Sequence, residues 1–167
     1  DPMFHRYVLG IPGRNLDSFF LPTEGVRKVL VDAVREEQAG IAVLEGVMGY
    51  YDGLGGTETS ASSWEIAEIT DTPAILVLDC KGASLSAAAM ASGFLHFRKN
   101  SHIVGVILNR VSSMYYERLA AAVAEASGLP VRGYLPESEE YRMESRHRGH
   151  FLPGEIDRLR ERIGRLA

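Results

Sequence analysis

The sequence contains one cysteine and three lysines among its 167 residues. A single cysteine, Cys80, excludes a disulfide within the chain and a metal site built from several cysteines. Eighteen basic residues against 22 acidic ones give a net charge of −4, which lacks the basic excess typical of nucleic-acid binding. The apolar runs are far shorter than a bilayer span and no signal-peptide pattern is present, so we expect a cytoplasmic protein without a membrane partner.

Four short apolar runs divide the chain. They are "IAVLE" (41–45), "AILVLD" (74–79), "IVGVILN" (103–109) and "VRGYLP" (131–136). The first three are rich in Val, Ile and Leu, which is typical of strands in a parallel sheet; the fourth pattern is weaker. Helical patterns separate the runs, so the sequence predicts an α/β fold with an open, mostly parallel sheet, flanking helices and right-handed crossovers.

The helical patterns carry recognisable start and stop signals. Thr23 can cap a helix that continues to about Gln38, and Ser62 or Ser63 can cap the next one. The later patterns cover 84–99 and 114–128, and Gly128 ends the second of these. The tail over 154–167 is predicted to be an amphipathic helix that packs against the domain or joins it to another.

Polar residues stand at the carboxyl end of each predicted strand. These ends are Glu45–Gly46, Asp79–Cys80, Asn109–Arg110 and Leu135–Pro136. Ligands of open parallel sheets bind outside the carboxyl ends of the strands. If all four strands are parallel, these residues meet at one edge and form the predicted site.

The stretch "EGVMGYYDG" (45–53) places Glu45 directly after an apolar run and Asp52 seven residues later among glycines. An acid at a strand end is a common way to hold Mg²⁺ beside a nucleotide phosphate, and glycines let backbone amides approach an anion. The alternative is a solvated acid followed by a glycine turn. The local pattern leaves both interpretations open.

A phosphate-binding loop of the form G-x-x-x-x-G-K-[ST] does not occur in these 167 residues. The stretch "CKGAS" (80–84) contains Lys, Gly and Ser in a different arrangement. Two explanations are open: the fold does not bind phosphate, or its first strand and phosphate loop lie before residue 1.

Several stretches, in order along almost the whole chain, resemble one family. They are "DPMFH" (1–5), "RNLDSFF" (14–20), "EGVMGYYDG" (45–53), the segment 72–94, "VGVILNRVSS" (104–113), "VRGYLPE" (131–137) and "SRHRGHFLP" (145–153). The chain resembles the amidoligase domain of the cobyrinic acid a,c-diamide synthase family. The patterns EGVMG-x-x-DG and DP-x-FH with RNLD are specific to it, whereas the strand followed by "NR" is shared with dethiobiotin synthetase and cobyric acid synthase.

The resemblance implies a P-loop NTPase-like, dethiobiotin-synthetase-like fold whose first strand and phosphate loop are missing. Residues 1–167 would be a partial ATP-binding amidoligase domain that lacks the N-terminal P-loop segment and the C-terminal glutaminase domain. The implied chemistry uses ATP and Mg²⁺ to phosphorylate a and c side-chain carboxylates of a corrin, cobyrinic or hydrogenobyrinic acid. Ammonia from glutamine then displaces the phosphate. The fragment alone is expected to be inactive, and a homodimer is compatible with this assignment.

The resemblance also assigns site residues. Glu45 is the predicted Mg²⁺ ligand, and Glu45 and Asp52 are the predicted catalytic residues. The predicted nucleotide-binding residues are Gly46, Asn109, Arg110 and Pro136, and the predicted substrate-binding residues are His5, Arg14, Asn15 and Asp17. For Asp52 and Asn109 the alternative is a turn-forming or capping role, and for the substrate set it is folding of that segment onto the sheet.

Other functions remain open. A cobyric acid synthase or a dethiobiotin-synthetase-like ligase would share the fold, and a nucleotide-binding regulatory module without catalysis would share the strand-end pattern. His147 and His150 have no neighbours suited to metal coordination in the sequence, so we do not expect them to bind metal.

Overall fold

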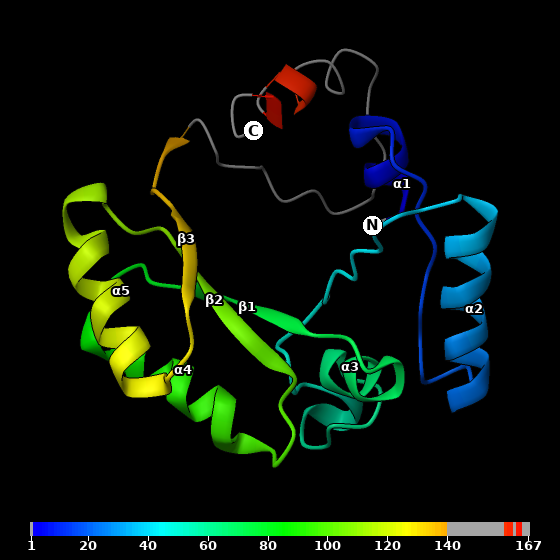
Figure 1. The fold of residues 1–167 in the computed structure, drawn as a ribbon, viewed down its shortest axis with the longest axis horizontal. Coiled ribbons are helices and arrows are strands. Elements are labelled where there is room, and N and C mark those ends of the chain that lie inside the picture. Colours follow the sequence, from blue (N-terminus) through cyan, green and yellow to red (C-terminus); the bar gives the residue numbers. More distant parts are fainter. Residues whose placement is uncertain (1, 140–158, 162, 165–167) are drawn as a thin grey trace.

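The computed structural model describes residues 2–139, 159–161 and 163–164, and its centre is a three-stranded parallel sheet. The strands are β1 (Ala74–Asp79), β2 (Ile103–Asn109) and β3 (Val131–Leu135), in the order β1-β2-β3 (Figure 1). Helix α4 (Leu85–Phe97) connects β1 to β2, and α5 (Ser113–Ser127) connects β2 to β3. Three of the four predicted strands and the parallel α/β class are therefore confirmed.

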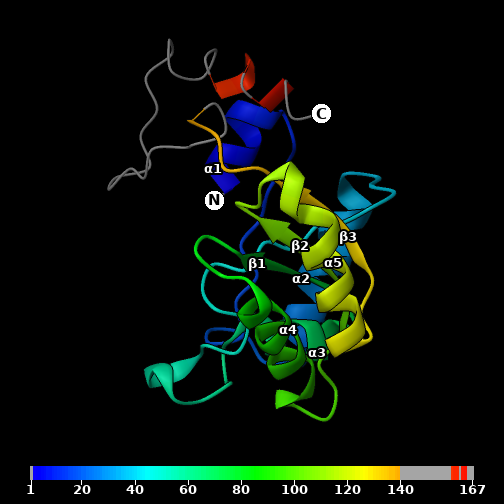
Figure 2. The same cartoon turned by 90° about the vertical axis from the view of Figure 1, so that its left-hand side faces the viewer.

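The rest of the described chain lies around this unit. The N-terminal region forms α1 (Pro2–Phe4) and a π-helical turn, η1 (His5–Leu9), and is followed by α2 (Thr23–Glu36). A 3₁₀ turn, η2 (Leu54–Gly56), precedes α3 (Ser63–Thr70). Helices α4 and α5 lie together on one side of the sheet, and α2 and α3 lie on the other side of the molecule (Figures 1 and 2). Among the described residues, no helix combines the length and the hydropathy needed to cross a bilayer.

The predicted helix boundaries are close to the observed ones. The hydroxyl of Ser62 accepts a hydrogen bond from the backbone N–H of Glu65 at 3.2 Å, as a helix N-cap does. At the carboxyl end of a different helix, α5, Gly128 adopts a left-handed conformation with φ of 71°. Thr23 is the first residue of α2 rather than its cap, because Pro22 holds the cap position.

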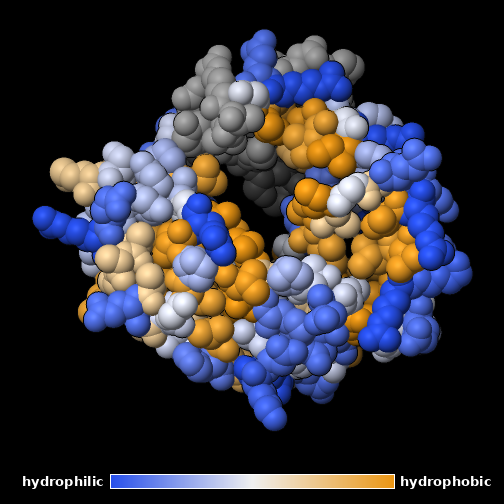
Figure 3. Space-filling view, viewed as in Figure 1, coloured by the Kyte–Doolittle hydropathy of each residue, from blue (hydrophilic) through white to orange (hydrophobic). Residues whose placement is uncertain are grey.

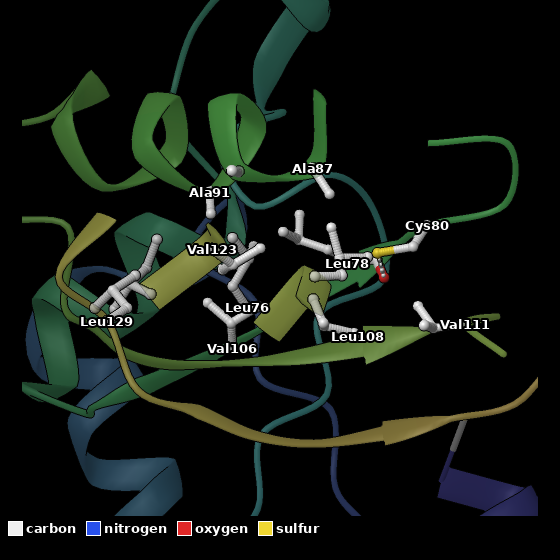
Figure 4. Close-up of a cluster of buried hydrophobic side chains, with 13 residues drawn as sticks. Leu76, Leu78, Cys80, Ala87, Ala91, Val106, Leu108, Val111, Val123 and Leu129 are labelled. Carbon is white, nitrogen blue, oxygen red and sulfur yellow. Dashed lines mark hydrogen bonds between the residues drawn. The ribbon is translucent and has the colours of Figure 1, made fainter. Parts of the chain in front are cut away.

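The hydrophobic core lies between the sheet and the pair α4–α5. Side chains of alternate strand residues enter it, including Leu76, Leu78, Val106 and Leu108 (Figure 4). Small residues of α4, Ala87 and Ala91, face them and let the helix approach the sheet closely. Cys80 is buried at the end of this cluster, where its thiol lies 3.5 Å from the carbonyl oxygen of Leu78. Burial raises the pKa of this thiol, as expected of a packing residue and not of a nucleophile.

The strand predicted over 41–45 does not form. Residues 41–46 have no regular secondary structure, and Ile41 and Val43 are 83% and 90% exposed. A continuous apolar run becomes a strand only when neighbouring strands satisfy its backbone N–H and C=O groups, and no described strand pairs with it. The apolar pattern therefore predicted a buried strand, whereas these side chains are exposed in the structure.

The tail predicted as a helix is only partly described. Residues 159–161 and 163–164 are helical, and the remaining residues of 154–167 lie outside the described part of the chain, as do His147 and His150. The guanidinium of Arg160 donates hydrogen bonds to the carbonyl oxygens of Tyr7 (2.9 Å) and Val8 (3.2 Å). The described part of the tail thus contacts the end of η1, which agrees with a packing role.

Two glycines provide a matched stability test. Gly93 lies inside α4 with open space where a Cβ would be, so Gly93→Ala should raise the free energy of unfolding by roughly 0.5–1 kcal/mol. Gly128 has open space too, but its φ is positive, so Gly128→Ala should lower the free energy of unfolding by roughly 1 kcal/mol. Urea unfolding of the two variants measures both values, and the same sign for both would contradict the assigned helix boundaries.

Candidate functional site

The carboxyl ends of the three strands meet at one edge of the sheet. The parallel register pairs Asp79 with Asn109 and Asn109 with Leu135. The backbone N–H of Cys80 donates to the carbonyl oxygen of Asn109 at 2.8 Å, and that of Val111 donates to Leu135 at 3.2 Å. The predicted nucleotide-binding residues Asn109, Arg110 and Pro136 therefore lie on adjacent strand ends, as the sequence predicted.

Charged side chains from all three strand ends interact at this edge. The guanidinium of Arg110 forms a bidentate ion pair with Asp79, and Lys81 pairs with Glu137 just after β3. The hydrogen bonds from Arg110 lower the pKa of the Asp79 carboxyl, and the one from Lys81 lowers the pKa of the Glu137 carboxyl. Sequence reasoning gave no role to Asp79, Lys81 or Glu137, although Asp79 was visible as the residue that ends its strand.

Glu45 lies away from this network. Its carboxylate is 3.1 Å from Nε2 of His5, and its side chain is more than half exposed. The next residue, Gly46, approaches α3 so closely that an added Cβ would lie 2.6 Å from the hydroxyl oxygen of Ser63. The structure thus places Glu45, a predicted catalytic residue, beside His5, a predicted substrate-binding residue. It does not place Glu45 at the carboxyl ends of the strands.

The loop that contains Asp52 is attached near the amino end of β2, at the opposite end of that strand from Asn109. The Tyr50 hydroxyl donates to the carbonyl oxygen of Ser101 (2.6 Å), and the Tyr51 hydroxyl donates to that of Phe94 (2.7 Å). Burial is the main reason that the pKa of Tyr50 rises to about 12. Ser101 precedes the first residue of β2, and seven residues of strand span roughly 20 Å. Asp52 is therefore far from Asn109 in this structure.

The turn that contains Asp52 explains its glycines. The backbone N–H of Asp52 donates to the carbonyl oxygen of Gly49 at 2.9 Å, and the Asp52 carboxylate occupies the space that a Cβ on Gly49 would need. A Cβ on Gly53 would collide with the backbone carbonyl of Ser60. The backbone contact requires glycine at position 53, whereas a Cβ at position 49 would only require the Asp52 side chain to move.

The remaining predicted substrate residues lie in the segment before α2. Arg14 forms ion pairs with Glu36 and Glu37 at the end of α2, and the Asp17 carboxylate accepts the backbone N–H of Phe19 at 2.8 Å. Asn15 is exposed in the same segment. These contacts match the alternative interpretation, in which the segment folds onto the domain, and they leave a role in substrate binding untested.

Nowhere in residues 2–139, 159–161 or 163–164 do three His, Cys, Asp or Glu side chains gather closely enough to hold a metal ion by themselves. Mg²⁺ is commonly held by one or two carboxylates together with water and substrate phosphates. The exposed carboxylate of Glu45 fits that chemistry as a single protein ligand.

An open parallel sheet with polar residues gathered at its carboxyl edge is the architecture of P-loop NTPase-like α/β domains. Comparison with known families agrees, since the AAA domain family matches residues 16–145. The chain belongs to this AAA domain family.

Curated relatives cover nearly all of the chain. Three cobyrinate a,c-diamide synthases illustrate the similarity. The one from Thermoplasma acidophilum is 40% identical over 99% of this chain, that from Priestia megaterium is 37% identical over 100%, and that from Listeria innocua is 40% identical over 95%. The chain spans only 37%, 37% and 35% of their respective lengths. No solved structure matches the chain.

Proposed function

We propose that this chain is the ATP-binding amidoligase part of a cobyrinate a,c-diamide synthase. The observation that carries the proposal is the similarity of nearly the whole chain to curated synthases of that name, at 36–40% identity. In the proposed reaction, ATP phosphorylates the a and c side-chain carboxylates of cobyrinic or hydrogenobyrinic acid in turn. Ammonia from glutamine then attacks each acyl phosphate, an amide forms, and phosphate leaves. Such phosphoryl transfer depends mainly on positioning and charge neutralisation.

In this proposal, the complete domain is larger than the part of it that the described residues form. One face of β1 is uncovered: Ile75 and Val77 point away from the core and are 45% and 57% exposed. Figure 3 shows apolar surface around a hollow between the two sides of the molecule. An additional strand with its phosphate loop, supplied by a segment before residue 1, would extend the sheet together with the apolar run 41–45. This extension would bury the exposed side chains and carry Glu45 to the carboxyl edge.

Each site residue has a role in this proposal. Glu45 would bind Mg²⁺, and the ion would neutralise charge on the transferred phosphoryl group. Asn109, Arg110 and Pro136, with the backbone at Gly46, would form the nucleotide-binding part of the site. Among the described residues, the Asn109 amide makes no side-chain hydrogen bond, and Ser112 occupies the N-cap position of α5. An amide that is not engaged in capping can offer both its donor and its acceptor to adenine.

The corrin substrate and its nitrogen source complete the proposal. His5, Arg14, Asn15 and Asp17 would meet the polar periphery of the corrin, with Arg14 suited to a carboxylate. Glutamine would be hydrolysed by a glutaminase domain outside these 167 residues. Both reactants are soluble metabolites, so we expect the synthase to work in the cytoplasm, as a monomer or a homodimer.

The direct test is an assay of the intact protein from which this chain comes. With ATP, Mg²⁺, glutamine and cobyrinic acid, mass spectrometry should detect the monoamide and then the a,c-diamide. Omission of ATP or glutamine should stop both steps. Absence of amide products with the corrin, when all components are present, would reject the proposed function.

The same proposal predicts how the chain behaves by itself. The described residues offer no phosphate cradle, so the 167-residue chain should bind ATP-Mg with a dissociation constant well above the micromolar range. The intact protein should bind it at least about tenfold more tightly, because it adds the backbone amides and the lysine of the phosphate loop. Isothermal titration of the two proteins compares the values. Micromolar binding by the chain alone would contradict the missing-segment proposal.

A further inference from the structure

Arg110 has an unusual backbone conformation for its residue type. Its φ is 62°, in the left-handed region, and it directly follows Asn109 at the end of β2. This conformation costs an ordinary L-residue roughly 1 kcal/mol relative to glycine. It turns the chain sharply between two fixed points, the carbonyl oxygen of Asn109 held by Cys80 and the N–H of Val111 held by Leu135. The turn thus fixes the path of the chain directly after Asn109.

The side chain of Arg110 returns to the neighbouring strand. Its Nε lies 2.7 Å from Oδ1 of Asp79, and a terminal nitrogen bonds to the other carboxylate oxygen. The same Oδ1 accepts the backbone N–H of Lys81 at 3.1 Å. Asp79 is thus fixed to the turn after β1 and holds Arg110 through both oxygens. A planar, bidentate pair of this kind fixes orientation better than a single bond.

The register places this pair beside Asn109. Asp79 and Asn109 are direct partners across β1 and β2, and Arg110 follows Asn109, so the Asp79–Arg110 pair lies next to Asn109. The guanidinium is occupied by Asp79, while the Asn109 amide has no partner in the described part of the chain. The arrangement favours Asn109, and not Arg110, as the group that meets a ligand.

We infer that Asp79 is a positioning residue: through its bidentate pair with Arg110 it holds the left-handed turn that aims the Asn109 amide at the adenine base. Arg110 acts through this turn without touching the nucleotide. The inference rests on the proposed function, because it assumes that ATP binds at this edge. It gives Asp79, which had no assigned role, a part in ATP binding, and it makes the part of Arg110 indirect.

Two substitutions at one position separate the backbone role from a ligand contact. Arg110→Ala and Arg110→Gly both remove the guanidinium, but only glycine adopts positive φ without strain. In the intact protein, Arg110→Ala should weaken ATP binding about fivefold to tenfold relative to Arg110→Gly, which corresponds to the conformational cost of the turn. Arg110→Ala should also reduce the preference for ATP over GTP, because the Asn109 amide loses its alignment with the base.

Asp79→Ala supplies the second comparison. Alone it should weaken ATP binding and reduce the ATP preference as Arg110→Ala does, because the turn loses its support. Combined with Arg110→Gly it should cause no further loss beyond Arg110→Gly. Such rescue by glycine would not occur if Asp79 merely stabilised the fold, and thermal unfolding of each variant checks that the fold is kept.

Three results would overturn the inference. Equal losses for Arg110→Ala and Arg110→Gly would show that the guanidinium contacts the nucleotide. Wild-type affinity and base preference in Asp79→Ala would show that the pair does not position Asn109. Failure of the wild-type intact protein to bind ATP at all would reject the proposed function and with it this inference, a result distinct from the other two because no variant is needed to see it.

Discussion

Replacement of Glu45 by glutamine in the intact protein should lower the rate of corrin amidation about a thousandfold or more, because Mg²⁺ in the proposed site would lose its protein carboxylate. Glutamine has nearly the same shape as glutamate but lacks the negative charge that holds a divalent cation. Glu45 is largely exposed and outside the core, so the fold should be retained. The measurement is the initial rate of amide formation at saturating ATP.

A matched control lies in the same glycine-rich region. Glu58 is exposed, and its described contacts are made by its backbone, so Glu58→Gln should keep the wild-type rate. A second variant, Glu45→Asp, keeps the charge on a shorter side chain and should restore part of the rate at raised Mg²⁺ concentration. Near-normal turnover of Glu45→Gln at ordinary Mg²⁺ concentration would remove Glu45 from the metal site.

The fold was predictable where local pattern and tertiary partners agree. The runs 74–79 and 103–109 become strands with the predicted bounds because each has a parallel neighbour and a helix to cover one face. The third strand ends at Leu135, one residue before the predicted end, since Pro136 has no N–H to donate to a ladder. The run 41–45 has the same apolar composition, but no strand among the described residues pairs with it, so the strand that composition predicted does not form in this structure.

The candidate site was predictable only at the level of strand ends. Parallel topology brings Asp79, Asn109 and Leu135 to one edge, and a sequence pattern is sufficient to foresee that. The left-handed turn at Arg110 could not be foreseen, because arginine has no preference for positive φ and the turn depends on contacts from two other strands. The attachment of Tyr50 to Ser101 likewise joins residues far apart in the sequence. Contacts of this kind are a property of the fold and leave no local signal.

Asp52→Asn in the intact protein should lower kcat at least about a hundredfold while the KM for ATP changes less than about twofold. The prediction follows from the proposed extension of the sheet. If the run 41–45 pairs as a strand parallel to β1, Glu45 reaches the carboxyl edge and Asp52 follows on a loop of glycines. An acid there can orient the corrin carboxylate or accept a proton as ammonia attacks the acyl phosphate. In the proposed site the nucleotide would not contact Asp52.

The design of this variant separates chemistry from folding. Asparagine keeps the size of the side chain above Gly49 and leaves the backbone hydrogen bond of the turn in place, so the thermal midpoint should stay near wild type. Asp71→Asn is the matched control, since Asp71 is almost fully exposed at the end of α3 and asparagine tolerates its left-handed conformation. A lower thermal midpoint for Asp52→Asn would make the residue a turn former.

The kinetic pattern of Asp52→Asn also decides where the loop lies in the working enzyme. In the structure described here, Tyr50 and Tyr51 hold the loop at the amino edge of the sheet, roughly 20 Å from the strand ends. A carboxylate at that distance cannot take part in the reaction. An unchanged kcat would mean that the tyrosine attachments persist in the intact protein. A several-fold rise in the KM for ATP at constant kcat would instead make Asp52 a nucleotide or metal contact. A selective loss of kcat requires that the loop leave the amino edge when the strand at 41–45 forms.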